Sequence, residues 1–427
     1  MKTFFRVLLP LTLAVVLSAC APAATPAPLA EFRIPPYLLY TAQPDSMTVM
    51  WKASSAPRQV FIEWGADQTC QGGKAEVQDT SGEQGGRLMS YTIHGLKPGN
   101  RTFYRVTLDG QTRASSFVTG PRDPAHFSLY AVSDTQVNPA VQDKLMAGIL
   151  ADIQQQPESR QTILLHGGDH VSHGLVETDW LIEYFNAYYK NLSSALASLP
   201  VVGALSNHHL YEAKEYVKIC AKPYARVYRK YFPYSFYVDP EHFYYSIDYG
   251  PVHITVIDPY TAEYQPGSQQ YAWLQADLAK PAAYRIVIVH QTAWAYRRSA
   301  YALRQHLHPL FMASGVNVVL QGHEHYYNRL VVDGIDYGPG GGGGGTLTYP
   351  DKFLTQYDDP EDALVMSTCV DVPFELDPEL PVVDLVDPKK AFRANHYLRL
   401  DWDGEKMSIR VVDIEGKLLD CFPQGAV

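Results

Sequence analysis

The chain has 427 residues, about three times a typical domain length, so we expect one large core or two to three smaller ones. Hydrophobic residues make up 46% and charged residues 19%, which excludes a mainly disordered chain. The chain has 35 Lys and Arg against 45 Asp and Glu, a net charge of −10, so nucleic-acid binding is not expected. An anionic substrate would therefore need local cations, such as metal ions.

The N-terminus has the pattern of an export signal. Lys2 and Arg6 precede an uncharged apolar run over 7–19, which is too short to span a bilayer. The run ends in Leu-Ser-Ala before Cys20, which resembles the lipobox of bacterial lipoproteins. We therefore predict a signal peptide at 1–19, then a lipidated Cys20 and an Ala/Pro tether at 20–33, with the protein anchored by lipid in the bacterial cell envelope and facing the periplasm or exterior. The alternative is a cleaved secretory signal with an incidental cysteine.

Four further cysteines follow, and outside the cytoplasm they could form two disulfides with three possible connectivities. No two of them form a CxxC pair, so a thiolate metal site is not expected. They are Cys70, Cys220, Cys369 and Cys421.

Residues 34–120 contain short alternating apolar stretches separated by Gly, Pro, Asp and Ser turns, which predicts a small all-β sandwich. The segment from Leu96 to Gly99 (LKPG), followed by Thr-Phe-Tyr-Arg-Val at 102–106, resembles the turn and strand of fibronectin type III-like domains. Such a domain is found at the N-terminus of purple acid phosphatases. The resemblance implies that Tyr104 packs at the corner of the sandwich.

From 124 to 427 the pattern changes to strands alternating with helices, which predicts an α/β layered domain. We expect strands at 126–132, 162–166, 286–289 and 316–320, a hairpin over 244–258, helices at 138–153, 178–196 and 269–280, and a final hairpin with strands at 398–402 and 407–411. Residues 349–393, rich in Asp and Pro, are predicted to be irregular.

Polar side chains gather where the expected strands end. Because the carboxyl ends of strands in an α/β layer converge on one edge, these side chains can meet at one site. They offer only oxygen and nitrogen donors, which suits Mn, Fe or Zn. The residues lie in the stretches 133–136 (SDTQ), 167–170 (GGDH) and 206–209 (SNHH), at His290 and in 322–325 (GHEH).

This ordered set resembles the calcineurin-like metallophosphoesterase superfamily, whose blocks run D-x-H, G-D, G-N-H-D/E, H and G-H-x-H. With the sandwich in front, purple acid phosphatases are the most similar branch. The resemblance implies two mixed sheets flanked by helices and two divalent or trivalent metal ions (Fe, Mn or Zn). Residue by residue, it implies that the first metal is held by Asp134, Asp169 and His325, with Gln136 as a further candidate, and the second by Asp169, Asn207, His290 and His323.

The implied activity is hydrolysis of phosphate mono- or diesters, since two cations can acidify a water to hydroxide and bind phosphoryl oxygens. His208, which has no ligand role in the family pattern, is predicted to protonate the leaving group or stabilise the transition state. The alternative is a metal-binding or adhesive surface lipoprotein in which catalysis is impaired.

Three departures from the family motivate that alternative. Gln136 replaces the histidine of D-x-H, Ser172 stands where purple acid phosphatases have a tyrosine, and His209 replaces an acid expected to orient His208. Without a phenolate ligand, no charge-transfer colour is expected. The Ser172 hydroxyl, His170 or His173 could complete the first metal site.

Two further stretches bear on the predicted site. The six glycines at 340–345 lack the Lys-Ser/Thr of a phosphate loop, so a tight turn beside the metals is expected. Trp294 and the stretch 296–298 (YRR) follow His290 and could either line the substrate pocket or lie in a solvated loop.

Overall fold

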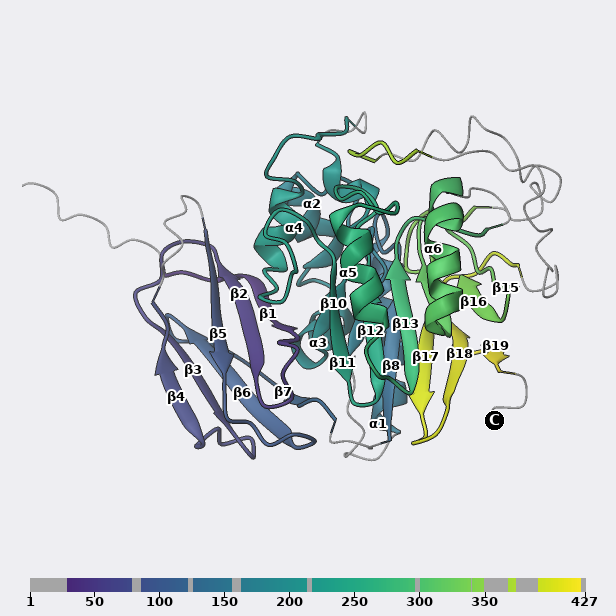
Figure 1. The fold of residues 1–427 in the computed structure, drawn as a ribbon. Helices are drawn as coiled ribbons and strands as arrows, with labels where there is room; N and C mark the ends of the chain where they lie inside the picture. The colour runs from purple at the N-terminus through teal and green to yellow at the C-terminus, as the bar shows by residue number, and fades with distance from the viewer. Residues whose placement is uncertain are drawn as a thin grey trace, which may run out of the picture.

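The computed structural model describes residues 29–78, 86–121, 126–155, 163–212, 217–295, 300–338, 340–348, 368–373 and 391–423. The predicted export signal, Cys20 and most of the tether lie outside these residues, as does most of the 349–393 segment. In the described part of the chain, no helix is both long and apolar enough to cross a membrane. Figure 1 shows a β-sandwich, in purple and blue, beside a larger α/β part.

The N-terminal part is the predicted sandwich of two antiparallel layers. In β6 every second residue is buried, as expected for a strand with one face on the core. Trp51 and Tyr104 are fully buried between the layers. One layer contains β1 (Phe32–Leu39), β2 (Met47–Ala53) and β5 (Arg87–Ile93), and the other β4 (Gly73–Glu76), β3 (Val60–Gly65), β6 (Arg101–Leu108) and β7 (Gln111–Val118).

The first layer of the sandwich continues into the α/β part. Leu39 of β1 pairs in parallel with Val201, so one nine-stranded sheet runs through both parts in the order β19-β18-β17-β8-β9-β10-β1-β2-β5. Its other strands are β8 (Phe127–Val132), β9 (Leu164–His166), β10 (Val201–Gly203), β17 (His396–Trp402), β18 (Met407–Asp413) and β19 (Leu418–Phe422).

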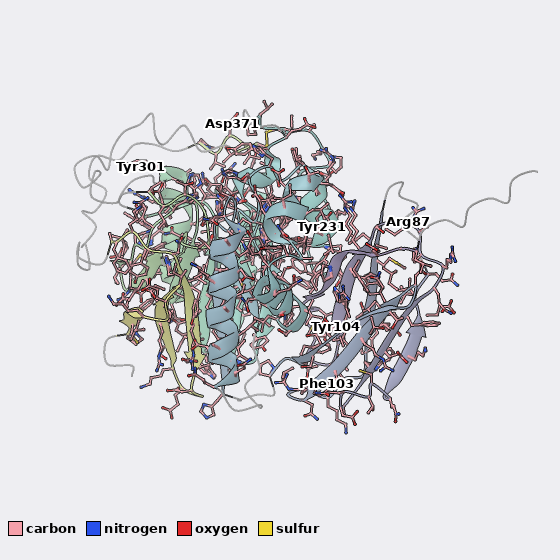
Figure 2. All side chains as sticks on the ribbon, turned by 180° about the vertical axis from the view of Figure 1, so that it is seen from behind. Arg87, Phe103, Tyr104, Tyr231, Tyr301 and Asp371 are labelled. Carbon is pink, nitrogen blue, oxygen red and sulfur yellow. A yellow bond between two sulfur atoms is a disulfide. The ribbon has the colours of Figure 1, made fainter. Side chains whose placement is uncertain are left out.

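Polar contacts also join the two parts. Tyr104 packs in the sandwich, but its hydroxyl donates to the Ala197 carbonyl of the α/β part at 2.7 Å. The buried Lys52 ammonium lies 2.7 Å from the Glu177 carboxylate and also donates to the Tyr231 hydroxyl. Figure 2 shows Tyr104 and Tyr231 along this boundary. The domain boundaries 34–120 and 124–427 remain predictions.

A six-stranded mixed sheet faces the nine-stranded one, in the order β11-β12-β13-β14-β16-β15. Residues of both sheets, including Leu129 and Ile288, form one core. The predicted pair of mixed sheets flanked by helices is therefore confirmed. The strands are β11 (Tyr245–Tyr249), β12 (Val252–Val256), β13 (Tyr284–Val289), β14 (Val318–Gln321), β15 (Leu330–Val332) and β16 (Ile335–Gly338).

Helices cover the outer faces of both sheets. α1 (Pro139–Gln154) begins where Asn138 accepts a hydrogen bond from the Val141 amide and Pro139 occupies the first turn. α5 (Gln269–Leu278) and α6 (Tyr301–Ser314) pack on the six-stranded sheet through a core that includes Leu274 and Leu307. Figure 1 shows both in front of that sheet.

The prediction of one continuous helix at 178–196 is wrong. The chain instead forms a short α2 (Glu177–Asp179), a π-helical turn η1 (Trp180–Tyr184) and α3 (Lys190–Ser198). The wider turn puts Trp180 and Tyr184 into the core, where both rings lie against the His170 ring. Packing of two large aromatic residues thus overrides helix periodicity.

Short elements that were not expected from the sequence include the 3₁₀ turn η2 (Asn207–Leu210), helix α4 (Arg226–Tyr231) and the strands β15 and β16. Strand β19 was not expected either, and it adds a third strand to the final hairpin.

One disulfide is present among the described residues, between Cys220 and Cys369, and neither Cys70 nor Cys421 forms a disulfide there. The second disulfide that four cysteines would allow is therefore not formed among the described residues.

Candidate metal centre

The predicted site residues all follow the carboxyl ends of strands, and the fold brings them to one place. β8, β9 and β10 are parallel neighbours in one sheet, and β13 and β14 are parallel neighbours in the other. Their following loops carry, in chain order, Asp134 and Gln136, then Asp169, then Asn207 and His208, then His290, then His323 and His325.

Two overlapping groups of side chains could each hold a metal ion. One contains Asp134, Asp169 and His325, and the other Asp169, His290 and His323; within each group the donor atoms lie within 4.8 Å of one another. Asp134, Asp169 and His290 are buried, whereas the two remaining histidines are half-buried. Asp169 is common to both groups, which is the arrangement predicted for a bridging carboxylate.

The loops are held in place by each other. Asp134 and Asp169 both have positive φ, 59° and 50°, which aspartate tolerates better than most residues. The Asp134 amide donates to the Gly168 carbonyl at 3.0 Å, and the Thr135 amide to the Asp169 carbonyl at 2.9 Å. The two carboxylates are therefore presented by a rigid pair of turns.

Backbone carbonyls orient two of the imidazoles. His290 Nδ1 donates to the Gly167 carbonyl at 2.8 Å, and His325 Nδ1 donates to the Thr346 carbonyl at 3.0 Å. A carbonyl only accepts, so both rings keep Nε2 for the site. His290 Nε2 lies 3.2 Å from Asp169 Oδ2, and His325 Nε2 lies 3.4 Å from Asp134 Oδ1.

The remaining predicted ligands also face this site. Asn207 Oδ1 lies 3.3 Å from His323 Nδ1. The Gln136 Nε2 atom lies 3.2 Å from both Asp169 Oδ2 and His325 Nε2, while its Oε1 is buried without a hydrogen-bond partner. Buried amide oxygens nearly always have a hydrogen-bond partner or a bound ion. The lone Gln136 oxygen, together with the neighbouring carboxylates and imidazoles, therefore fits a site that binds a cation.

Burial and charge act against each other on the pKa values of these side chains. Burial raises the pKa of both aspartates, but nearby histidines outweigh it: His290 and His325 hold the pKa of Asp134 below its usual range, and His208 and His290 hold that of Asp169 well below. Burial lowers the pKa of His325, but Asp134 and Asp169 raise it to about 9. The site therefore attracts cations.

His208 lies at the edge of the two groups. Its Nδ1 donates to the Ser172 carbonyl at 2.7 Å, and its Nε2 is 3.6 Å from Asp169 Oδ2. Its side chain keeps 16% exposure, so the ring can reach a bound substrate.

The three alternatives for completing the first metal site face other partners. The Ser172 hydroxyl donates to Glu183 Oε2 at 3.1 Å, and His173 Nδ1 pairs with Asp179 at 2.7 Å. His170 Nδ1 lies 3.1 Å from His209 Nε2 in the core. None of the three belongs to either metal group.

His209 has a structural role that the sequence did not reveal. The Ser206 amide donates to its Nδ1 at 3.0 Å, which completes a capping box at the start of η2. The Ser206 hydroxyl in turn accepts from the Asp169 amide at 2.9 Å. His209 thus supports the backbone of the bridging residue instead of orienting His208.

The glycine run lies beside the site, as expected for a tight turn. The Gly343 amide donates to the Ser133 carbonyl and the Gly345 amide to the Asp134 carbonyl, both at 2.8 Å. A Cβ atom on Gly340 would lie 1.8 Å from the Gln321 carbonyl oxygen, and one on Gly345 would lie 2.6 Å from the His325 ring. The run is therefore packed too closely for any side chain.

Trp294 does not line a pocket. It is 2% exposed, and the Arg304 guanidinium stacks on its ring at 4.2 Å. The segment 296–298 lies outside the described residues.

Comparisons with known proteins agree with this arrangement. The sequence profile of the Calcineurin-like phosphoesterase family matches residues 127–327, and that of the Purple acid Phosphatase N-terminal domain matches residues 35–119.

Individual relatives are purple acid phosphatases. The purple acid phosphatase of Glycine max is 27% identical over 251 residues, or 56% of this chain and 52% of the relative. Purple acid phosphatase 18 of Arabidopsis thaliana is 34% identical over 94 residues, or 20% of this chain and 21% of the relative. These matches thus span about half of the relatives' length or less.

Two solved structures share the fold. A purple acid phosphatase from yellow lupin (Lupinus luteus) seeds has a TM-score of 0.66 at 15% identity, covering 91% of this chain and 73% of the other. PhoD has a TM-score of 0.60 at 14% identity, covering 91% and 88%. The chain therefore contains a calcineurin-like metallophosphoesterase domain and, in front of it, the N-terminal domain of purple acid phosphatases.

Proposed function

We propose that the protein is a metal-dependent phosphoesterase that hydrolyses phosphate mono- or diesters. The observation that carries the proposal is the pair of three-residue groups that share the buried Asp169 carboxylate. The match of residues 127–327 to the Calcineurin-like phosphoesterase family supports it.

The first ion would be held by Asp134, Asp169 and His325 with Gln136, and the second by Asp169, Asn207, His290 and His323. Hard to borderline ions such as Fe, Mn or Zn suit these oxygen and nitrogen donors. When bound, two such ions supply positive charge for the phosphoryl group and an acidified water for attack on phosphorus.

The chain's own residues supply the proton chemistry. The Ser172 carbonyl keeps one proton on Nδ1 of His208, so Nε2, which faces the site, is the atom that can take up and release a proton. We propose that this proton passes to the leaving oxygen of the ester.

The test combines metal content and turnover on the chain from Ala21 onward. Elemental mass spectrometry is expected to find two ions per chain, and a chromogenic phosphomonoester and phosphodiester, assayed with added Mn, Fe or Zn, identify the preferred class. His208→Ala is expected to keep both ions but to lower kcat by about 10²–10⁴-fold. His126→Ala is the control, because this exposed histidine precedes the opposite end of β8. One ion or none, with no turnover under any metal, would refute the proposal.

We also propose that Cys20 carries a lipid anchor in the bacterial cell envelope. The disulfide between Cys220 and Cys369 supports an oxidising compartment. Globomycin, which blocks lipoprotein signal cleavage, is expected to cause accumulation of the uncleaved chain, and Cys20→Ala is expected to release the protein from membranes.

A further inference from the structure

Glu183 connects two loops of the metal centre, although nothing in its sequence context marks it. It lies in the π-helical turn η1, and its Oε2 atom accepts three hydrogen bonds. The donors are the Val137 amide at 3.1 Å, the Ser172 amide at 2.8 Å and the Ser172 hydroxyl at 3.1 Å. One carboxylate oxygen thus ties the loop after β8 to the loop after β9.

The first of these loops contains an unfavourable turn. The Asn138 amide donates to the Gln136 carbonyl at 2.9 Å, and Val137 between them has φ of 73°. This is the dihedral region of a γ-turn that is rare and strained, and a β-branched residue there is an outlier. Such a conformation persists only where its surroundings impose it.

The γ-turn determines where Gln136 points. Gln136 is 1% exposed and reaches Asp169 and His325, whereas Val137 is 52% exposed. The bond from the Val137 amide to Glu183 holds the turn in this conformation. If the turn relaxed to negative φ, the Gln136 amide would lose its place beside Asp169.

The second loop carries the contact that orients His208. The Ser172 carbonyl accepts from His208 Nδ1, and the Ser172 amide and hydroxyl are both bound to Glu183. The link from Glu183 to His208 therefore passes through one residue. This link replaces the carboxylate that the family pattern would place at position 209.

We propose that Glu183 is a positioning residue that holds both His208 and Gln136 in their working orientations. The catalytic consequence rests on the proposed phosphoesterase function, whereas the effect on the His208 ring does not.

Substitutions of Glu183 can distinguish the role of its acceptor oxygen from the role of its negative charge. Glu183→Ala removes the acceptor and leaves two backbone amides without it. Glu183→Gln keeps an oxygen that can accept from both amides, so it is the conservative rescue. Glu183→Asp withdraws the carboxylate by about 1.5 Å, the length of one carbon–carbon bond, so one oxygen no longer reaches all three donors. Ile182→Ala is the matched control, because this neighbour in η1 is 58% exposed.

The first measurement is the tautomer of His208 in metal-free protein, from two-bond ¹H–¹⁵N correlation spectra of ¹⁵N-histidine-labelled chains with the ring neutral. The signal is assigned by its loss in His208→Ala. Wild type, Glu183→Gln and Ile182→Ala are expected to carry the proton on Nδ1. In Glu183→Ala we expect a mixture of tautomers, and in Glu183→Asp a smaller change in the same direction.

The second measurement is kinetics on the metal-loaded protein. Glu183→Ala is expected to lower kcat by about 10–100-fold, as outer residues of metal sites commonly do, while KM changes less than about twofold. Glu183→Gln is expected to restore most of kcat.

An unchanged His208 signal and unchanged kcat in Glu183→Ala would overturn the inference. If circular dichroism shows that Glu183→Ala does not fold, Glu183→Asp decides in the same way. A wild-type chain that is inactive with every metal would refute the phosphoesterase function, and the spectra would still test the orientation of His208.

Discussion

Asp277 in α5 forms a buried ion pair with His253 in β12. This pair allows a quantitative test of how much the contact between α5 and the six-stranded sheet contributes to the unfolding free energy. The His253 Nε2 to Asp277 Oδ2 distance is 2.9 Å, and both side chains are at most 1% exposed. The Asp277 carboxylate also accepts from the Ser246 and Thr255 hydroxyls and from Lys280. We consider the substitution Asp277→Asn, which keeps the shape but removes the charge.

The magnitude follows from the pKa of Asp277. Burial raises this pKa, but hydrogen bonds from His253, Lys280 and Ser246 outweigh it and lower it from 3.8 to about 2. At about 1.4 kcal/mol per pH unit, this difference corresponds to about 2 kcal/mol of unfolding free energy. We therefore expect Asp277→Asn to lower the unfolding free energy by about 2–3 kcal/mol, somewhat less than the roughly 3–5 kcal/mol that breaking a buried ion pair commonly costs, because the substitution keeps the hydrogen-bonding shape of the side chain.

The pH dependence has a definite sign. The lowered pKa of Asp277 means that its contribution is complete above about pH 4 and is lost as the pH falls toward about 2. Burial lowers the pKa of His253, but Asp277 and Asp248 raise it above 6.5 overall, so its contribution is complete below 6.5 and is lost as the pH rises through the raised value. The pair therefore stabilises the fold most between about pH 4 and 6.5.

The assay is urea unfolding followed by tryptophan fluorescence, for wild type and Asp277→Asn, at several pH values. The difference in unfolding free energy is expected to be largest near about pH 5.5 and to shrink below about pH 4. Asp248→Asn is the control: Asp248 pairs with His253 Nδ1, but its side chain is 68% exposed, so we expect a loss of less than about 1 kcal/mol. Equal losses for the two variants, or a loss independent of pH, would refute the reasoning.

Three further predictions concern the cysteines and the glycine run. A chain beginning at Ala21, denatured without reductant, is expected to expose the two thiols Cys70 and Cys421 to Ellman's reagent, and a count of zero would contradict the single bridge. Reduction of the Cys220–Cys369 bridge, which closes a 149-residue separation, is expected to lower the unfolding free energy by about 3–5 kcal/mol in urea titrations. Gly345→Ala is expected to displace the His325 ring and weaken metal binding about 10–100-fold by calorimetry, and unchanged affinity would contradict the close packing.

Much of the site could be predicted because strand ends are visible in the sequence. Apolar runs mark β8, β9, β13 and β14, and the polar residues directly after them must lie at the carboxyl edge of their sheets. Asp134, Asp169 and His323 need little more than this to be brought together, since each side chain is placed by the end of its own strand.

Residues whose roles depend on side-chain direction could not be predicted. His209 and Ser172 stand next to predicted site residues in the sequence, yet one faces the core and the other binds Glu183. Glu183 lies in a segment whose hydrophobic pattern indicated a regular helix, and only the packing of Trp180 and Tyr184 turns that segment into a π-helical turn.

By itself, the sequence determined that a β-sandwich precedes an α/β part, the edge at which the site lies and the donor atoms that meet there, because these follow from local periodicity and from the residues at strand ends. Only the tertiary structure decided which neighbours of the ligands enter the site, which cysteines pair and how the sandwich joins the α/β sheet. Those outcomes depend on contacts between segments far apart in the chain, such as Leu39 with Val201 and Cys220 with Cys369, and no local pattern encodes them.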